Sequence, residues 1–189
     1  MIDSLLYQNI LKLAPISEVA LNELFHIATY RKLAKGEVLL NDGQVCKSIF
    51  FIETGYLRTF MRNDGKEINT DFAFENSFTT NIKSLRSETA STVTIQAAEP
   101  TTVYEFDKNE LLQLYNKSPE LESFGRKLLE HLLIQQEEHS NLFKIYSPKE
   151  RYQYVQANYP ELLQRVSLTQ LASFLGTARE TLSRIRKNP

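Results

Sequence analysis

The spacing of apolar residues divides the chain into a helical start, a central stretch of short strands and a helical C-terminal part. Helical spacing predicts helices over residues 3–13 and 17–29. From residue 30 onward the segments are short, rich in β-branched and aromatic residues, and separated by turns such as Asp42-Gly43 and Asp64-Gly65. This pattern predicts strands over 37–40, 48–53, 57–62, 66–72, 91–97 and 102–107. Strands at this spacing are typical of a sandwich or barrel.

A long helix is predicted after the strands. Ser118-Pro119-Glu120 has the residue types of a helix start, and no proline follows until Pro148. Such a helix over 118–146 would be roughly 40 Å long. Two sets of residues repeat every seven positions on it, which predicts the seam of a parallel homodimer. The seam would contain Leu121, Leu128, Leu132, Gln135, His139 and Leu142.

The long helix also has a plainer interpretation, in which it packs on the strands of its own chain. Leu129, Leu133 and Phe143 are expected to make that contact, which leaves the seam for a second copy. Ser147-Pro148-Lys149-Glu150 has the pattern of a new helix start, with Glu150 completing a capping box. We therefore place a domain boundary at residue 147.

The last 22 residues predict a helix-turn-helix. Counted from Leu168, alanine falls where a second helix must approach closely (Ala172), and glycine falls where the chain turns sharply (Gly176). Apolar residues fall at the positions that face the angle between the two helices: Leu171, Leu175, Leu182 and Ile185. Ser167 with Gln170 and Thr177 with Glu180 have capping-box spacing. Together these matches indicate the motif, although none would do so alone.

The second helix of this motif, predicted over Thr177–Lys187, carries candidate DNA contacts. Arginine can bind guanine through two hydrogen bonds, and glutamate can accept one from cytosine. We expect base or phosphate contacts from Thr169, Arg179, Glu180, Ser183, Arg184, Arg186 and Lys187, with the last two at phosphates. The plainer interpretation is that Glu180 only caps the helix and that the arginines are solvated.

The distribution of charge indicates that the chain has two parts of different character. Residues 147–189 carry a net charge of +4, whereas residues 1–146 carry −5. A basic segment beside an acidic body is typical of an anion-binding part joined to a sensing part. Cys46 is the only cysteine, which excludes an internal disulfide and a cysteine-held iron–sulfur cluster within one chain. Neither a secretory signal nor an apolar run long enough to span a membrane is found, so a cytoplasmic protein is expected.

The glycine-punctuated strands, the long helix and the sequence Ala178-Arg179-Glu180-Thr181-Leu182-Ser183-Arg184 resemble the Crp/Fnr family of bacterial transcription regulators over nearly the whole chain. The resemblance implies an α+β fold. A helix-flanked β-roll of jelly-roll type would span 1–117, a dimerisation helix 118–146, and a helix-turn-helix without a complete wing 147–189. It also implies that Arg179, Glu180 and Arg184 contact bases in an inverted repeat with half-sites near TGTGA. RNA polymerase is a further candidate partner.

The effector region departs from the cyclic-nucleotide-binding members of that family. Those members carry Phe-Gly-Glu and an Arg-Ser/Thr pair, whereas this chain has Phe74-Glu75-Asn76 and Ala90-Ser91-Thr92. Loss of a charge-assisted arginine contact to the cyclic phosphate would remove roughly 2–3 kcal/mol. We therefore expect no cAMP binding, and no metal or other cofactor is implied. The candidate pocket residues are Glu75, Asn76, Arg86, Ser91 and Thr92.

The leading hypothesis is a homodimeric, sequence-specific DNA-binding transcription regulator. The alternative is a module that senses a nucleotide-like small molecule and signals through a protein partner. An enzyme is not expected, because the sequence contains neither a nucleophile–base arrangement nor a phosphate-binding glycine loop.

Overall fold

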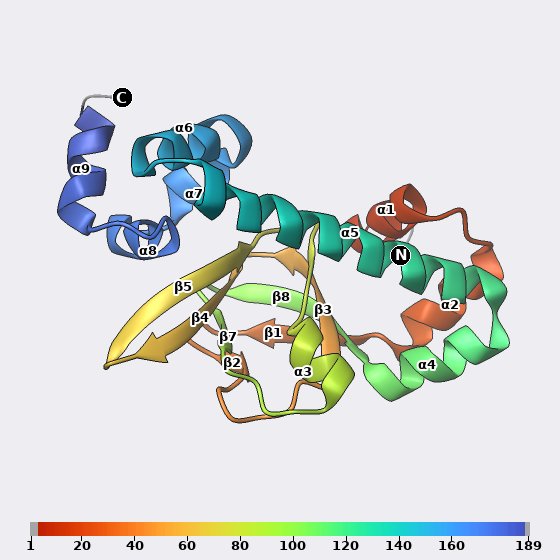
Figure 1. The fold of residues 1–189 in the computed structure, drawn as a ribbon. Helices are drawn as coiled ribbons and strands as arrows, with labels where there is room; N and C mark the ends of the chain where they lie inside the picture. Colours follow the sequence, from red (N-terminus) through yellow and green to blue (C-terminus); the bar gives the residue numbers. More distant parts are fainter. Residues whose placement is uncertain (1–3, 188–189) are drawn as a thin grey trace.

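A computed structural model of the chain describes residues 4–187 (Figure 1). The chain starts with helices α1 (Leu5–Leu13) and α2 (Glu18–Ile27), which are capped by the side chains of Ser4 and Ser17. The predicted start of the first helix at residue 3 lies outside the described residues. Helix α1 places Leu6 and Ile10 in the core beside the strands, and α2 places Ala20, Leu21 and Leu24 there.

The strands form a roll of two antiparallel sheets. One sheet has the order β1 (Thr29–Leu33), β8 (Thr101–Asp107), β3 (Ser48–Thr54) and β6 (Phe78–Thr79). The other has the order β2 (Val38–Leu40), β7 (Thr94–Ala97), β4 (Leu57–Asn63) and β5 (Lys66–Ala73). This confirms the predicted α+β fold with an N-terminal β-roll. Strands β1 and β6 were not predicted, because neither shows a clear alternation of apolar and polar residues.

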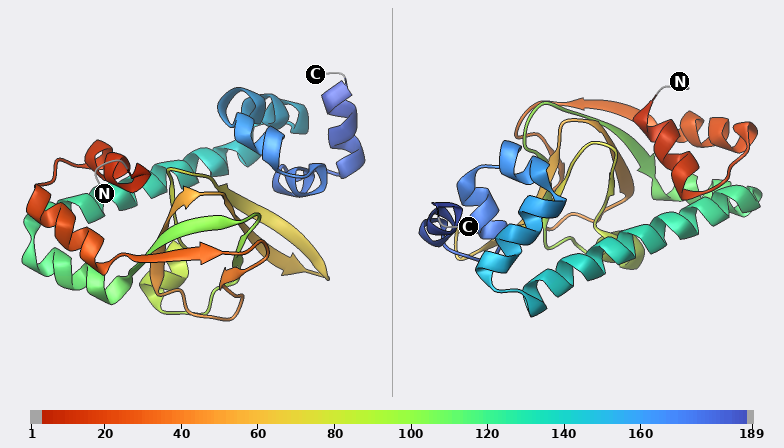
Figure 2. Two further views of the ribbon diagram at one scale, coloured as in Figure 1. Left: turned by 180° about the vertical axis from the view of Figure 1, so that it is seen from behind. Right: turned by 90° about the horizontal axis from the view of Figure 1, so that it is seen from above.

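Three helices follow or interrupt the strands. Helix α3 (Ile82–Ser87), which was not predicted, lies between β6 and β7 and is capped by Asn81. Helix α4 (Lys108–Lys117) is capped by Asp107, and α5 (Pro119–Ile145) is capped by Ser118 with proline in its first turn. The 27 residues of α5 agree with the predicted long helix. Figure 2 shows that α5 runs the length of the molecule, from α4 to the C-terminal helices.

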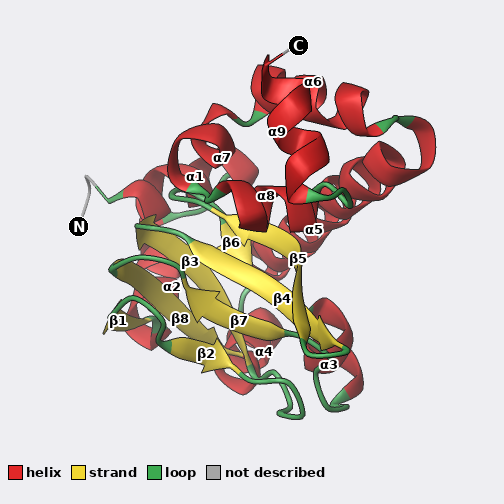
Figure 3. Ribbon diagram, turned by 90° about the vertical axis from the view of Figure 1, so that its left-hand side faces the viewer, coloured by secondary structure: helices red, strands yellow, loops and turns green. Residues whose placement is uncertain are grey.

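The C-terminal helices are α6 (Pro148–Asn158), α7 (Pro160–Arg165), α8 (Leu168–Phe174) and α9 (Arg179–Lys187). They lie at one end of α5 and above the edge of the roll that β5 forms (Figure 3). Their hydrophobic core also contains Tyr56 and Phe72 of the roll. The boundary predicted at residue 147 marks the capping box of Ser147 with Glu150, but the core beyond it is shared with the roll.

The faces of α5 differ from the prediction. Four of the six residues proposed for the dimer seam are buried in the core of the same chain: Leu121, Leu128, Leu132 and Leu142. Of the other two, Gln135 is exposed, and the ring of His139 stacks on Phe174 at 5.1 Å. These leucines pack against the roll and the other helices, so they are not free to form a seam.

The residues expected to pack on the strands are instead on the outside of α5. Leu129 is 48% exposed and Leu133 is 66% exposed, and Ile134 is also exposed. The prediction failed because both faces repeat every three to four residues, so spacing alone could not assign them. Phe143, the third residue expected on the strands, is half-buried and contacts the rings of His139 and Phe174.

Candidate DNA interface and effector region

The helix-turn-helix has the internal packing that its sequence predicts. Leu171, Leu175 and Leu182 are fully buried between the helices, and Ala172 lies beside them. Gly176 adopts a φ of +63° in the turn, a conformation that glycine takes without strain. The Ser167 side chain accepts a hydrogen bond from the backbone N–H of Gln170 and so caps α8. The motif is therefore formed at its diagnostic positions.

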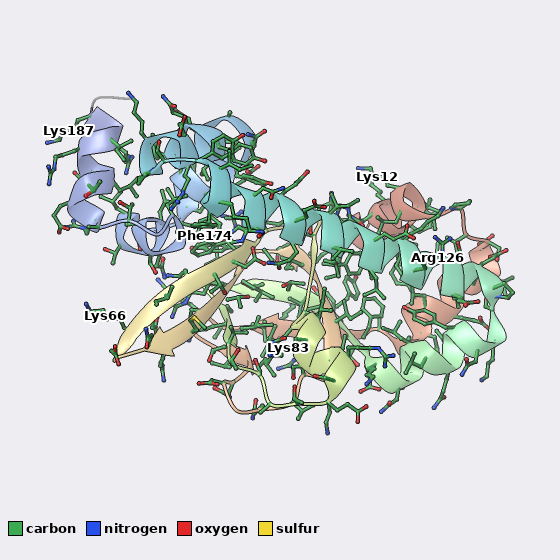
Figure 4. The ribbon with its side chains drawn as sticks, viewed as in Figure 1. Lys12, Lys66, Lys83, Arg126, Phe174 and Lys187 are labelled. Atoms are coloured by element: carbon green, nitrogen blue, oxygen red, sulfur yellow. The ribbon has the colours of Figure 1, made fainter. Side chains whose placement is uncertain are left out.

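The outer face of α9 is open to solvent. The side chains of Arg179, Glu180, Arg184, Arg186 and Lys187 are exposed, whereas Ser183 is half-buried. Among the hydrogen bonds and ion pairs within residues 4–187, none involves the side chain of Arg179, Glu180 or Arg184. Figure 4 shows Lys187 pointing away from the rest of the molecule. This face can therefore contact an external partner without breaking an existing bond.

One detail of the DNA-contact prediction differs. Helix α9 begins at Arg179, two residues after the predicted start at Thr177. Thr169 is exposed in the first turn of α8, where the backbone N–H groups of a helix favour a phosphate.

The residues predicted for the effector pocket do not come together. Glu75 and Asn76 lie in the turn between β5 and β6, on the side of the roll that faces the C-terminal helices. Arg86 is exposed on α3, and Ser91 and Thr92 precede β7. Figures 1 and 3 show α3 on the side of the roll away from α6–α9. The positions of these residues in the sequence do not show which turns lie at the same end of the roll, so the prediction could not separate them.

Glu75 and Asn76 also already have partners within the chain. Both oxygens of Glu75 accept hydrogen bonds from Arg165, at 2.7 and 2.9 Å. The backbone and side-chain oxygens of Asn76 accept hydrogen bonds from the Asn9 side chain. Assignment of these two residues to an effector pocket is therefore corrected: they connect elements of the protein.

The polar groups around α3 bond to one another. The Ser91 hydroxyl donates to the carbonyl of Val93 and accepts from the Asn81 amide at 2.9 Å. The Ser84 hydroxyl donates to the carbonyl of Thr89. Ser91 is also only 2% exposed. These hydroxyl groups would have to exchange partners before they could bind a ligand.

Two of the cavities within residues 4–187 differ in size and position. One, between α2, α4, α5 and the roll, has a volume of about 10 Å³ and an apolar lining, which leaves room for one water molecule at most. The other is a recess of about 470 Å³ that opens to solvent. Its lining residues are Leu39, Leu40, Gln44, Val45, Cys46, Lys47 and Phe50. None of the predicted pocket residues lines either one.

The structure shows a contact between the helix-turn-helix and the roll that the sequence did not indicate. Phe174 of α8 packs edge-on against Phe72 of β5, with ring centroids 5.4 Å apart. The Ser173 hydroxyl accepts from the backbone N–H of Asn69 and donates to the carbonyl of Glu67. In Figure 4, Phe174 lies where α8, α5 and β5 meet. These residues are about 100 positions apart in the chain, so no local pattern reports the contact.

Burial at this junction affects His139. Desolvation lowers the pKa of His139 below its ordinary value, although the carboxylate of Asp71 acts in the opposite direction. His139 is therefore neutral near pH 7, which suits its stacking on the ring of Phe174.

Comparisons with known proteins agree with this architecture. Residues 30–118 match the family model described as the cyclic nucleotide-binding domain. A search of curated proteins found no match. Within residues 4–187, no helix has the length and apolar character needed to cross a bilayer.

Several solved structures have the same fold. FixK2 from Bradyrhizobium japonicum is 18% identical, with a TM-score of 0.70 over 86% of this chain and 84% of that chain. The c-di-GMP-responsive global regulator CLP of Xanthomonas campestris is 18% identical, with a TM-score of 0.66 over 91% of each chain. A CooA mutant from Carboxydothermus hydrogenoformans is 16% identical, with a TM-score of 0.66 over 95% of this chain and 82% of that chain. Residues 30–118 therefore match the cyclic nucleotide-binding domain model, and the chain has the fold of these solved structures.

Proposed function

We propose that this protein is a sequence-specific DNA-binding transcription regulator that acts as a homodimer. The observation that carries the proposal is the exposed face of α9, where Arg179, Glu180 and Arg184 have no partners within residues 4–187. A second helix of this motif enters the major groove with its N-terminal residues against the base edges. Arg179 and Arg184 would donate to guanine, and Glu180 would accept from cytosine.

Contacts to phosphates would supplement this recognition. Arg186 and Lys187 lie in the last turn of α9, and Thr169 lies in the first turn of α8. The charges of Arg186 and Lys187, and a hydrogen bond from the Thr169 hydroxyl, would raise affinity for any DNA without distinguishing sequences. Discrimination would therefore depend on the first turns of α9.

The dimer would form through the outer face of α5. Leu129, Leu133 and Ile134 are large apolar side chains exposed on this helix, and Arg126 extends the same side toward its start. Two antiparallel or parallel copies could cover them, but only a parallel two-fold pair presents two α9 helices to one side of DNA. The two reading helices would then contact half-sites about 34 Å apart, one turn of DNA.

The effector, if DNA binding requires one, would not be cAMP. The loop before β7 offers Ala90 where the related nucleotide-binding sequences have arginine, and the Ser91 hydroxyl is used within the loop. A cyclic phosphate would therefore lack the arginine contact, and the Ser91 hydroxyl would have to leave its present partners to bind it. The alternative of a small-molecule sensor that signals through a protein partner is distinguished by its lack of DNA affinity.

Selection of bound duplexes from a random DNA pool tests the proposal. The wild-type protein is compared with Arg179→Ala/Arg184→Ala, and with Lys32→Ala/Lys35→Ala as a control that removes the same charge from exposed positions of the roll. We expect the wild type and the control to enrich an inverted repeat, and the α9 variant to lose it. Equal enrichment by all three proteins, or none by the wild type even at low salt, would contradict the proposal.

A further inference from the structure

Three turns of the roll meet at the end that faces the C-terminal helices. They connect β3 to β4, β5 to β6, and β7 to β8. The backbone N–H of Gly55 in the first turn donates to Glu75 in the second at 2.7 Å. The carbonyl of Tyr56 accepts from the backbone N–H of Ala98 and from the Thr101 hydroxyl, both near the third turn. These bonds hold the three turns as one unit.

Arg165, the last residue of α7, inserts its side chain into this unit. Its guanidinium donates two hydrogen bonds to Glu75 of the second turn and another to Glu99 of the third. It also lies over the rings of Tyr56 and Phe74, 5.1 and 5.3 Å from their centroids. The Tyr56 hydroxyl in turn donates to the backbone carbonyl of Arg165. We call this set of contacts the Arg165 clamp.

Arg165 and Glu75 of the clamp are charged at neutral pH. The hydrogen bonds that Arg165 donates to the Glu75 carboxylate raise the pKa of Arg165, with Glu99 adding to the effect. Burial alone would raise the pKa of Glu75, but the hydrogen bonds and charge of Arg165 lower it below its ordinary value. Charge-assisted hydrogen bonds with two-point geometry are stronger and more directional than bonds between neutral groups. The clamp can therefore fix the orientation of α7 relative to the roll, and not only hold the two in contact.

The clamp fixes the position of α9 through a short chain of packed residues. Val166 and Ser167 connect Arg165 directly to α8. Helix α8 is bound to α9 through the buried Leu171 and Leu182. A second attachment, Phe174 against Phe72 of β5, holds the other end of α8. Helix α9 is thus oriented by the roll and not only by its covalent connection to α5.

This docking leaves the DNA-contacting face free. The side chains of Arg179 and Arg184 are exposed, and the clamp uses neither of them. The contact therefore leaves both arginines available to DNA. It restricts the orientations that the helix-turn-helix can adopt about the junction at Ser147, which lowers the ordering cost when two reading helices must meet two half-sites.

We propose that Arg165 is a positioning residue for DNA binding: it fixes the reading helix to the three turns of the roll through Glu75 and Glu99. The proposal rests on the proposed function for its DNA part. Because Glu75 lies in the segment that leads into β6 and α3, a rearrangement of that segment reaches α9 directly through this contact.

Hydrogen-exchange mass spectrometry tests the contact itself. The variants are Arg165→Gln and Glu75→Gln/Glu99→Gln. The matched control is Arg31→Gln, because Arg31 also pairs with two glutamates, Glu37 and Glu105, within the roll. We expect faster exchange at the amide of Gly55 and across α7–α9 in the clamp variants, but not in the control. Unchanged exchange in the clamp variants would overturn the proposal.

Affinity for the selected duplex tests the positioning. We expect the clamp variants to bind about fivefold to tenfold more weakly than wild type and the control, a typical size for coupling between sites. Arg165→Glu would place a third carboxylate beside Glu75 and Glu99, and the repulsion should weaken DNA binding further. Addition of Glu75→Arg restores alternating charges and should recover most of the affinity. A clamp variant with faster exchange but equal or tighter DNA binding would overturn the positioning role.

The hydrogen-exchange experiment and the DNA-affinity experiment together distinguish a failure of this proposal from a failure of the proposed function. If the wild type selects no DNA, the proposed function fails and the DNA part of this proposal fails with it. The exchange arm then still decides whether Arg165 holds the helix-turn-helix on the roll, because it needs no DNA. If the wild type selects DNA and the exchange arm is negative, only the clamp fails.

Discussion

The outer face of α5 gives a prediction that separates the two possible dimer surfaces. Replacement of Leu129 and Leu133 by glutamate should convert the dimer to a monomer. Both side chains are on the surface of one chain, with 48% and 66% of their area exposed. Surface replacements of this kind change the stability of the monomer by within about 0.5 kcal/mol. The two replacements should therefore weaken the association of the protomers without unfolding the monomer.

The size of the effect follows from these exposures. Full burial of a leucine side chain contributes about 1.5–3 kcal/mol, so coverage of the exposed parts of these residues in both protomers contributes about 3–7 kcal/mol. Each 1.4 kcal/mol is a factor of ten in the dissociation constant. The dimer should thus weaken by at least a factor of about one hundred, and burial of four carboxylates would weaken it further.

Sedimentation equilibrium measures this directly, because the monomer has a mass of 21.9 kDa. The matched control is Val19→Glu/Leu112→Glu, which adds the same charge at residues 72% and 47% exposed on α2 and α4. The wild type and this control should sediment at twice the monomer mass, and Leu129→Glu/Leu133→Glu at the monomer mass with an unchanged circular dichroism spectrum. A wild-type monomer, or a Leu129/Leu133 variant that dimerises as well as wild type, would refute the reasoning.

Three further predictions concern stability, measured by urea denaturation. Gly55→Ala should lower the free energy of unfolding by about 1–3 kcal/mol, because φ is +80° there and the new Cβ would lie 2.6 Å from the Pro100 carbonyl; Gly36→Ala, at φ +87° in open space, should cost less. The stabilisation due to Glu75 should be present at neutral pH and disappear as pH falls through its lowered pKa, so the difference between wild type and Glu75→Gln should shrink on acidification; a constant difference would contradict this. Leu182→Ala, at a fully buried position, should cost about 2–5 kcal/mol, and a loss under 1 kcal/mol would contradict the packing described.

The helix-turn-helix could be predicted from sequence because its requirements are local. Gly176 must turn the chain, Ala172 must admit a second helix, and Leu182 must fill the angle, and all three lie within eleven residues. The structure places them accordingly. The length of α5 was predictable for the same reason, since Ser118 with Pro119 and Ser147 with Pro148 mark its ends.

The assignments that failed depend on contacts between distant segments. Leu128 and Leu129 are equally apolar and adjacent, and only the position of the roll decides that the first is buried and the second exposed. Glu75 was assigned to an effector pocket by its place in the sequence, whereas its partner Arg165 is 90 residues away. Sequence spacing shows which residues share a face of one helix or strand. Tertiary packing decides which of those faces is buried.

The measurement that tests the central claim most directly is selection of duplexes with the single variant Arg184→Ala beside the wild type. We expect the wild type to enrich an inverted repeat with half-sites one helical turn apart. Arg184→Ala should retain the repeat but lose its preference at one base pair of each half-site, because a side chain that reads one base controls that position only. An identical motif for both proteins, or enrichment of sequences without two-fold symmetry, would contradict the claim that α9 reads DNA in a homodimer.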